Sequence, residues 1–282
     1  INPNTKKLHT TYMQTVAATG RLSSNNPNLQ NIPIKTEKGR EIRRTFIPRN
    51  KEFILLAADY SQIELRIIAA LSEDENMQLA FVNKEDIHTA TAAKVFGVKQ
   101  NDVTREMRGK AKAVNFGIIY GQSAFGLSQN LNISRGEAKE IIESYFIQYP
   151  KIRTYMDKTI EQAKKNGYVE TILGRRRYLK DINSSNAIVR GHAERNAVNA
   201  PIQGSAADII KIAMINIHTG LKEGAYKSKM LLQVHDELVF DAHNNETDRL
   251  TAFVKDKMEN AVTLSVPLDV EIGIGKNWLQ AH

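Results

Sequence analysis

The sequence predicts an α+β fold, in which strands near both ends of the chain flank a long helical middle. Residues 53–58 (FILLAA) are a continuous apolar run, which is the pattern of a strand buried on both faces. Residues 72–148 carry helical patterns, with breaks near Gly97 and Asn132. Residues 229–241 predict a β-hairpin, because two short apolar strands flank a polar tip.

The remaining elements follow in chain order. Residues 1–50 are polar and turn-rich, which predicts a loop with short extended pieces. Apolar spacing predicts four more helices, the third of them ended by Pro201: residues 61–71, 150–166, 190–199 and 205–221. Residues 168–179 predict a second hairpin that turns near Gly174. Residues 246–263 predict an amphipathic helix, and the alternation of residues 266–274 predicts a strand with one apolar face.

The length and composition of the chain are compatible with one large domain or two modest ones. The chain has 282 residues, 41% of them hydrophobic, which is enough for a sizeable core. The absence of cysteine excludes disulfides and thiolate metal sites. No apolar run approaches the ~18 residues of a membrane span, and no signal peptide is recognisable. The chain starts at Ile1 without a Met, so we expect a fragment of a longer protein.

Positive charge is in excess and is locally concentrated. Lys and Arg number 39 against 31 Asp and Glu, a formal net charge of +8, and the pI is about 9.4. Such a balance favours an anionic partner. Two basic runs stand out: residues 94–112 carry six cations against two acids, and residues 164–180 carry six against Glu170 alone.

Four side chains recur every four residues in REMRGKAKAVNFGIIYG, residues 105–121: Arg108, Lys112, Phe116 and Tyr120. On a helix they form one slanting stripe about 18 Å long. Its order suits a nucleoside triphosphate, with phosphates on the cations, the sugar on Phe116 and the base near Tyr120. A solvated basic face leading into a buried aromatic end is the alternative. Gly117 and Gly121 argue against it, because each costs a helix roughly 1 kcal/mol relative to Ala and so indicates a close approach to the backbone.

Two aspartates lie at the ends of predicted strands. Asp59 comes directly after the apolar run, and Asp236 lies between His235 and Glu237 at the hairpin tip. Carboxylates on separate strand ends can share two divalent metals for phosphoryl transfer, and Mg²⁺ suits carboxylate and phosphate oxygens. Each aspartate alone is equally well explained as a cap or turn residue. The chain order of strand with Asp59, helix with the stripe, and hairpin with Asp236 is a far more specific indication of phosphoryl transfer than any of the three motifs alone.

Three further segments carry weaker signals. The loop TGRLSSNNPNLQNIP offers hydrogen-bonding groups for phosphates or base edges, although its composition fits an ordinary Asx-rich loop better: Arg21, Asn28, Gln30 and Asn31. His88 lies on a predicted helix, where a lone histidine is more often packed than a ligand. Residues 121–128 (GQSAFGLS) nearly match a phosphate-binding P-loop, but Leu127 replaces the essential Lys and no strand precedes it.

Taken together, the motifs resemble the C-terminal polymerase region of family A DNA polymerases, the bacterial DNA polymerase I type. The matching segments are TGRLSSNNPNLQNIP, DYSQIELR, RGKAKAVNFGIIYG, NAPIQGSAADIIK and VHDELVF. The resemblance covers nearly the whole chain, with no departure at a catalytic position. It implies a palm, an antiparallel sheet backed by helices, with inserted helical fingers, and neither a thumb nor an exonuclease region. The expected segments are palm 1–71, fingers 72–186 and palm 187–282.

The resemblance also implies residue roles. Two Mg²⁺ ions would be held by Asp59, the Tyr60 carbonyl, Asp236 and Glu237. The nucleotide would be bound by Gln62, Glu64, His88, Arg108, Lys112, Phe116 and Tyr120. Lys112 would act as an acid toward pyrophosphate, beside the catalytic Asp59 and Asp236, and Glu64 would block a ribose 2′-hydroxyl. The primer–template duplex would be lined by Arg21, Asn28, Gln30, Asn31, Arg195, Asn199, Gln203 and His235.

The function implied is template-directed addition of deoxynucleotides to a primer 3′-hydroxyl, with release of pyrophosphate. One alternative is a single-subunit RNA polymerase, against which Glu64 and Phe116 argue because both crowd the sugar. Another is a DNA-binding fragment that is inactive without its thumb. We expect primer–template DNA and deoxynucleoside triphosphates as partners, no membrane association, a monomeric state, and a location in the bacterial cytoplasm at the nucleoid.

Overall fold

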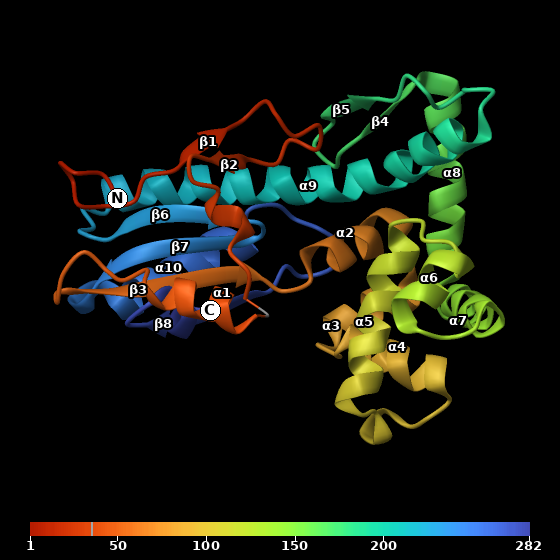
Figure 1. The fold of residues 1–282 in the computed structure, drawn as a ribbon, viewed down its shortest axis with the longest axis horizontal. Coiled ribbons are helices and arrows are strands. Elements are labelled where there is room, and N and C mark those ends of the chain that lie inside the picture. Colours follow the sequence, from red (N-terminus) through yellow and green to blue (C-terminus); the bar gives the residue numbers. More distant parts are fainter. Residues whose placement is uncertain (35) are drawn as a thin grey trace. The chain divides into compact units, whose positions relative to one another are not determined.

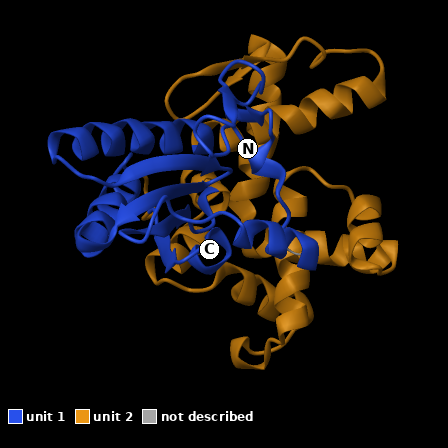
Figure 2. Ribbon diagram, turned by 60° about the vertical axis from the view of Figure 1, so that its left-hand side comes forward, with its two compact units in different colours: residues 1–63, 206–263, 268–282 blue, residues 64–205, 264–267 orange. Residues whose placement is uncertain are grey.

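The structure, a computed structural model, describes residues 1–34 and 36–282 (Figure 1). It consists of two compact units, drawn in different colours in Figure 2. The first comprises Ile1–Ile63, Ala206–Thr263 and Leu268–His282. The second comprises Glu64–Ser205 and Leu264–Pro267. The division into palm and fingers at residues 71 and 186 stays a prediction.

The first unit is built on a four-stranded antiparallel sheet with strand order β6-β7-β3-β8 (Figure 1). Its strands are β3 (Phe53–Tyr60), β6 (Lys229–Val234), β7 (Glu237–His243) and β8 (Val270–Gly275). Around it lie β1 (Thr11–Met13), β2 (Ser23–Asn25), η1 (Leu29–Asn31), α1 (Glu37–Arg44), η3 (Asn244–Glu246), α10 (Thr247–Glu259) and α11 (Trp278–Ala281). The α+β class and the two predicted hairpin strands are confirmed.

Strand β3 lies in the interior of this sheet and is covered on both faces, as its unbroken apolar run predicted. Successive side chains of a strand point to opposite faces. Leu55 and Ala57 pack with Trp278 of α11. At the end of the strand, the Tyr60 hydroxyl donates to the carbonyl of Met258 in α10 at 2.7 Å. The sheet therefore has helices on both faces, and its strand ends remain for polar groups.

The second unit is helical apart from one hairpin. Its elements are α2 (Ile63–Ser72), α3 (Glu75–Val82), α4 (Ile87–Phe96), η2 (Gln100–Asp102), α5 (Arg105–Ile119), α6 (Ala124–Leu131), α7 (Arg135–Gln148), α8 (Pro150–Asn166), β4 (Tyr168–Glu170) and β5 (Arg176–Tyr178). The predicted helix breaks are confirmed: Gly97 and Asn132 cap α4 and α6 in the left-handed conformation. The hairpin β4–β5 turns at Gly174, with φ of 77°.

Helix α9 (Ala187–Glu223) runs through Pro201 without interruption, so the prediction of two helices separated there was wrong. Proline has no amide hydrogen, and in a helix interior it costs about 3 kcal/mol relative to Ala. Burial offsets this cost: Ala197 and Ile202, on either side of the proline, are fully buried. Packing has overridden the local signal.

Two other elements differ from the prediction. Helix α1 was missed because its sequence, EKGREIRR, contains a single large apolar residue, and its clearest signal is Thr36, whose Oγ1 accepts from the Gly39 amide at 3.2 Å. The last strand was expected from residue 266 but begins at Val270, three residues after Pro267, which has no amide to donate to a ladder. Ile274 in this strand is 42% exposed, so the expected apolar face is incomplete.

Candidate functional site

The carboxylates singled out in the sequence lie together in the first unit. Asp59, near the end of β3, is directly opposite Glu237, the first residue of β7. The turn between β6 and β7 consists of His235 and Asp236. The Tyr60 amide donates to the Asp236 carbonyl at 3.2 Å, which ties the turn to the end of β3. Antiparallel pairing thus brings groups about 180 residues apart in sequence to one edge of the sheet.

The backbone beside these carboxylates adopts unfavourable conformations. His235 precedes Asp236 with φ of 55°, and Gln62 follows Asp59 by three residues with the same φ. A non-glycine residue in the left-handed region costs of order 1 kcal/mol or more and tends to occur at functional sites. In addition, Gln62 Oε1 is buried and accepts no hydrogen bond from the described residues. For His235 the positive φ is what a two-residue hairpin turn requires, whereas Gln62 combines a positive φ with an unsatisfied buried oxygen beside Asp59.

Burial and the neighbouring carboxylates both disfavour the ionised form of Asp59. Burial, reinforced by the charges of Glu237 and Asp236, raises the pKa of Asp59 to about 7. Asp236 is partly compensated by Arg21, whose Nη2 lies 4.0 Å from Asp236 Oδ1. A bound cation would relieve the remaining repulsion. Among residues 1–34 and 36–282, however, no three His, Asp or Glu side chains are already arranged as ligands of one ion.

The carboxylate of Glu237 is bound by side chains from elsewhere in the first unit. Its carboxylate accepts from Trp278 Nε1 at 2.9 Å and lies 3.3 Å from His282 Nδ1 and 4.0 Å from Arg43 Nη1. The hydrogen bond with Glu237 raises the pKa of His282. The Arg43 guanidinium also stacks over the Trp278 ring at 4.3 Å. Sequence reasoning gave Trp278 and Arg43 no role, although Trp278 belongs to the motif KNWLQAH.

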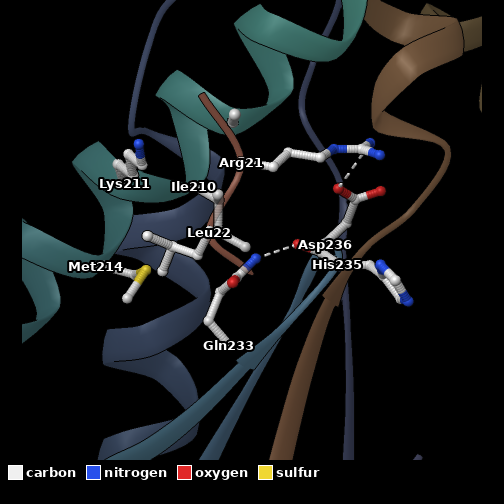
Figure 3. A pocket seen from close by; sticks show the side chains of 9 residues that line it. Arg21, Leu22, Ile210, Lys211, Met214, Gln233, His235 and Asp236 are labelled. Atoms are coloured by element: carbon white, nitrogen blue, oxygen red, sulfur yellow. Dashed lines mark hydrogen bonds and ion pairs between the residues drawn. The ribbon is translucent and has the colours of Figure 1, made fainter. Parts of the chain in front are cut away.

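A small pocket with mixed polar and apolar lining adjoins Asp236 (Figure 3). Arg21 reaches across it toward Asp236, whereas Gln233 donates to the His235 carbonyl and so braces the turn. On the wall formed by α9, Lys211 donates to the Gly20 carbonyl at 2.5 Å, which anchors the loop that carries Arg21. The structure therefore places Arg21 and His235 beside Asp236.

The other loop residues predicted to contact DNA are mostly used within the loop. Asn28 Oδ1 accepts from the Gln30 amide at 3.0 Å and caps η1. Gln30 Oε1 accepts from the Ser24 amide, and its Nε2 donates to Gln233 Oε1, both at 3.0 Å. Asn31 is exposed. Two of the four predicted side chains thus maintain the loop, and their role toward DNA stays a prediction.

The predicted stripe is present in the second unit. Arg108, Lys112 and Phe116 lie on α5, and Tyr120 is its C-terminal cap. The rings of Phe116 and Tyr120 are nearly parallel, with centroids 6.2 Å apart. Lys112 is exposed, whereas Arg108 pairs with Asp86. Burial alone would raise the pKa of Asp86, but hydrogen bonds from Arg108 and Thr89 outweigh it and hold that pKa below its ordinary value.

The glycines beside the stripe are explained by close contacts. A Cβ on Gly117 would lie 2.2 Å from Gln122 Oε1. Gly121 has φ of 70°, and a Cβ there would lie 3.0 Å from Arg195 Cγ. The close approach that the two glycines indicated therefore comes from side chains of the chain itself. It also places Arg195, on α9, against the end of α5.

Two more predicted residues join the stripe. Glu64 is 7% exposed and accepts a hydrogen bond from the Tyr120 hydroxyl. His88, on α4, is buried with its ring centroid 6.1 Å from that of Phe116. Burial lowers the pKa of His88 to about 4, so its ring is neutral at pH 7. The second unit thus collects two cations, a neutral imidazole, two aromatic rings and a carboxylate.

The last predicted group lies at every fourth residue of α9: Arg195, Asn199 and Gln203. Arg195 is exposed, and Asn199 Oδ1 is buried without a hydrogen-bond partner among the described residues. Sequence reasoning missed the buried Asn115, which hydrogen-bonds to His88 and has no local signal beyond its place in the motif NFG.

Comparison with known proteins agrees with this arrangement. The sequence signature of DNA polymerase family A matches residues 1–280. DNA polymerase I of Caldicellulosiruptor bescii is 55% identical over 280 residues, and that of Bacillus caldotenax 54% over 281, covering 99% and 100% of this chain. The chain spans only about a third of each relative, 33% and 32% respectively.

A solved structure is similar over almost the whole fold. It is the POL domain of Pol1 from M. smegmatis in complex with DNA primer-template and dNTP, with a TM-score of 0.95 and 51% identity. The match covers 98% of this chain and 48% of the other. With the palm-like sheet, the carboxylate cluster and the stripe in place, these matches show that the chain belongs to DNA polymerase family A.

Proposed function

We propose that the chain is the core of a DNA-directed DNA polymerase, which adds deoxynucleotides to a primer 3′-hydroxyl and releases pyrophosphate. The observation that carries the proposal is that Asp59, at the end of β3, and Asp236, in the turn tied to that end by the Tyr60 amide, lie at one edge of the sheet, where burial and mutual repulsion favour a bound cation. The DNA polymerase I relatives and the neighbour solved with primer-template and dNTP support it.

We propose that Asp59, Asp236 and the Tyr60 carbonyl hold two Mg²⁺ ions. Oxygen donors of this kind suit Mg²⁺. When bound, the ions would supply the positive charge that activates the attacking hydroxyl and stabilises the leaving pyrophosphate. Glu237, which is committed to Trp278, would hold the hairpin tip and add negative charge without being a direct ligand.

The residues of the second unit would bind and orient the nucleotide. Arg108 would exchange Asp86 for phosphate oxygens, and the exposed Lys112 would bind phosphate and donate a proton to the leaving pyrophosphate. Phe116 would stack on the sugar. Glu64, held by Tyr120, would present a fixed carboxylate that excludes a ribose 2′-hydroxyl.

Each unit has cations and amides that would contact the duplex. We propose Arg21, His235 and Asn31 in the first unit, and the row Arg195, Asn199 and Gln203 in the second. Affinity for DNA that depends on phosphate contacts falls linearly with the logarithm of salt concentration. The slope grows with the number of phosphate contacts, so a chain with few of them should bind duplex weakly and with a shallow salt dependence.

Primer extension on a labelled DNA duplex tests the proposal. Asp59→Asn and Asp236→Asn keep the side-chain shape but remove a charged ligand, so extension should be abolished while duplex binding survives. Glu52→Gln, an equivalent change just before the far end of β3, is the control and should extend normally. Near-normal extension by either aspartate variant would reject the metal assignment.

The same assay separates the alternatives. Glu64→Ala should raise kcat/KM for ribonucleotides relative to deoxynucleotides, because it opens space beside the sugar. A wild type that prefers ribonucleotides would favour the RNA polymerase alternative. A wild type that binds duplex but never extends it would favour a DNA-binding fragment.

We also propose that the protein acts as a monomer in the bacterial cytoplasm, at the nucleoid, as expected from its bacterial relatives. Within the described part of the chain, no helix has the length and apolar character needed to cross a membrane. Light scattering coupled to size-exclusion chromatography would test the monomer, and a mass of twice 31.7 kDa would contradict it.

A further inference from the structure

A buried chain of hydrogen bonds ends on His88. Tyr149 is hydrogen-bonded to the side chain of Thr91 on α4. Thr91 Oγ1 donates to Asn115 Oδ1 at 3.1 Å. Asn115 Nδ2 then lies 2.9 Å from His88 Nδ1. Asn115 is 0% exposed and Thr91 and His88 are each 2% exposed, so water does not compete for these contacts.

The chemistry of the amide determines where the imidazole proton lies. An amide nitrogen donates and cannot accept, so His88 Nδ1 must be the acceptor. In a neutral imidazole one nitrogen is protonated and the other is not, which leaves the proton of His88 on Nε2. The hydroxyl of Thr91 supports this amide orientation, because it donates to Asn115 Oδ1 while Nδ2 lies toward the ring.

The surroundings keep this ring neutral. Burial is the largest influence and lowers the pKa of His88 to about 4. The charged groups that act on the ring are Asp86, which raises its pKa, and Arg108 and Lys112, which lower it. Asp86 is itself occupied by Arg108 and by the amides of His88 and Thr89. The ring therefore acts through its tautomer, without a charge of its own.

We propose that Asn115 and Thr91 are positioning residues that hold His88 in the tautomer protonated at Nε2, so that it offers a hydrogen-bond donor to a nucleotide phosphate. The inference rests on the proposed nucleotide-binding role of His88. Phosphate oxygens are acceptors, so the opposite tautomer would turn a lone pair toward them. Asn115 directly precedes Phe116 on α5, and the ring of Phe116 lies beside that of His88. One turn of α5 thus supplies both Phe116, the proposed sugar contact, and Asn115, which orients His88 toward the phosphate.

Nitrogen-15 NMR of histidine-labelled protein at pH 8 reads the tautomer directly and does not require activity. His88→Gln identifies the signal among the seven histidines. The wild type should show a protonated Nε2 and an unprotonated Nδ1. Asn115→Asp keeps the shape but presents only acceptors, so the proton should move to Nδ1. Thr91→Val removes only the hydroxyl and should give a mixture of the two tautomers.

Thr159→Val is the matched control. Thr159 is also buried, and its hydroxyl also bonds a tyrosine, Tyr155, on the neighbouring turn of α8. It does not contact His88, so the tautomer should be unchanged. A wild-type His88 protonated at Nδ1, or the same tautomer in wild type, Asn115→Asp and Thr91→Val, would overturn the inference. Thr91→Val keeps the test decisive if the buried charge of Asn115→Asp prevents folding.

The second measurement is the Kd for a deoxynucleoside triphosphate with MgCl₂, by calorimetry. Loss of one neutral hydrogen bond corresponds to a weakening of about threefold to tenfold. Asn115→Asp should raise the Kd about tenfold or more, and Thr91→Val should raise it about threefold. Thr159→Val should have the Kd of the wild type. A shifted tautomer with unchanged Kd would refute the positioning role. A wild type that binds no nucleotide would refute the proposed role of His88, while the NMR result would still stand.

Discussion

Removing the charge of Asp59 should make the metal-free protein more stable. Burial and the neighbouring carboxylates move the pKa of Asp59 from 3.8 to about 7 in the folded state. The folded protein therefore binds a proton that the unfolded chain has already released, and its stability falls as the pH rises from about 4 to 7. Each pKa unit corresponds to about 1.4 kcal/mol, which sets a ceiling of about 4 kcal/mol. Because the side chain is partly exposed, we expect about 2 kcal/mol after solvent screening.

Urea unfolding of Asp59→Asn and wild type, in chelator at pH 5 and pH 8, measures this effect. The variant should be about 2 kcal/mol more stable at pH 8, and its advantage should be smaller at pH 5, because only part of the fall between pH 4 and pH 7 has occurred there. Adding MgCl₂ at pH 8 should stabilise the wild type and reduce the difference, since an ion that binds only the folded state raises its stability.

Glu52→Gln is again the control, because Glu52 is exposed just before the first residue of the same strand, so this variant should match the wild type at both pH values. A variant that is less stable than wild type at pH 8 would refute the reasoning. So would an equal gain at both pH values, because it would show that the charge of Asp59 is not the cause.

Three further predictions concern the second unit. In a double-mutant cycle, Glu64→Ala and Tyr120→Phe should couple by about 1.5–3 kcal/mol in urea unfolding, the range for hydrogen bonds to charged groups, and additive effects would contradict their bond. Gly121→Ala should destabilise the protein by about 1 kcal/mol more than Gly97→Ala, because both have positive φ but a Cβ at Gly97 meets nothing within 4 Å; equal losses would contradict the close contact. His88 is neutral when folded, so stability should fall as the pH drops from about 6.5 to 4, by up to about 3 kcal/mol, and His88→Gln should lose this dependence if the burial is responsible.

Local sequence patterns were reliable where an element depends on its own residues. The apolar run before Asp59 predicted a strand buried on both faces, and α8 (Pro150–Asn166) has the predicted bounds. Spacing alone predicted the stripe on α5, because helical periodicity is a property of the chain itself. Motif order then led to the family before any contact was known.

Local patterns failed where distant contacts outweigh local preference. Pro201 predicted a break, but burial on both sides of it keeps α9 continuous. Helix α1 was missed because its stability owes little to an apolar face.

The sequence by itself determined the strands, most helices, the family motifs and the identity of the charged and aromatic groups. Only the tertiary structure decided how those groups are used: that Glu237 is committed to Trp278, that Glu64 holds Tyr120, and that Asn115 orients His88. The physical reason is that a hydrogen bond depends on distance and direction in space. Residues 27 to 56 positions apart leave no periodic trace of such a bond in the sequence.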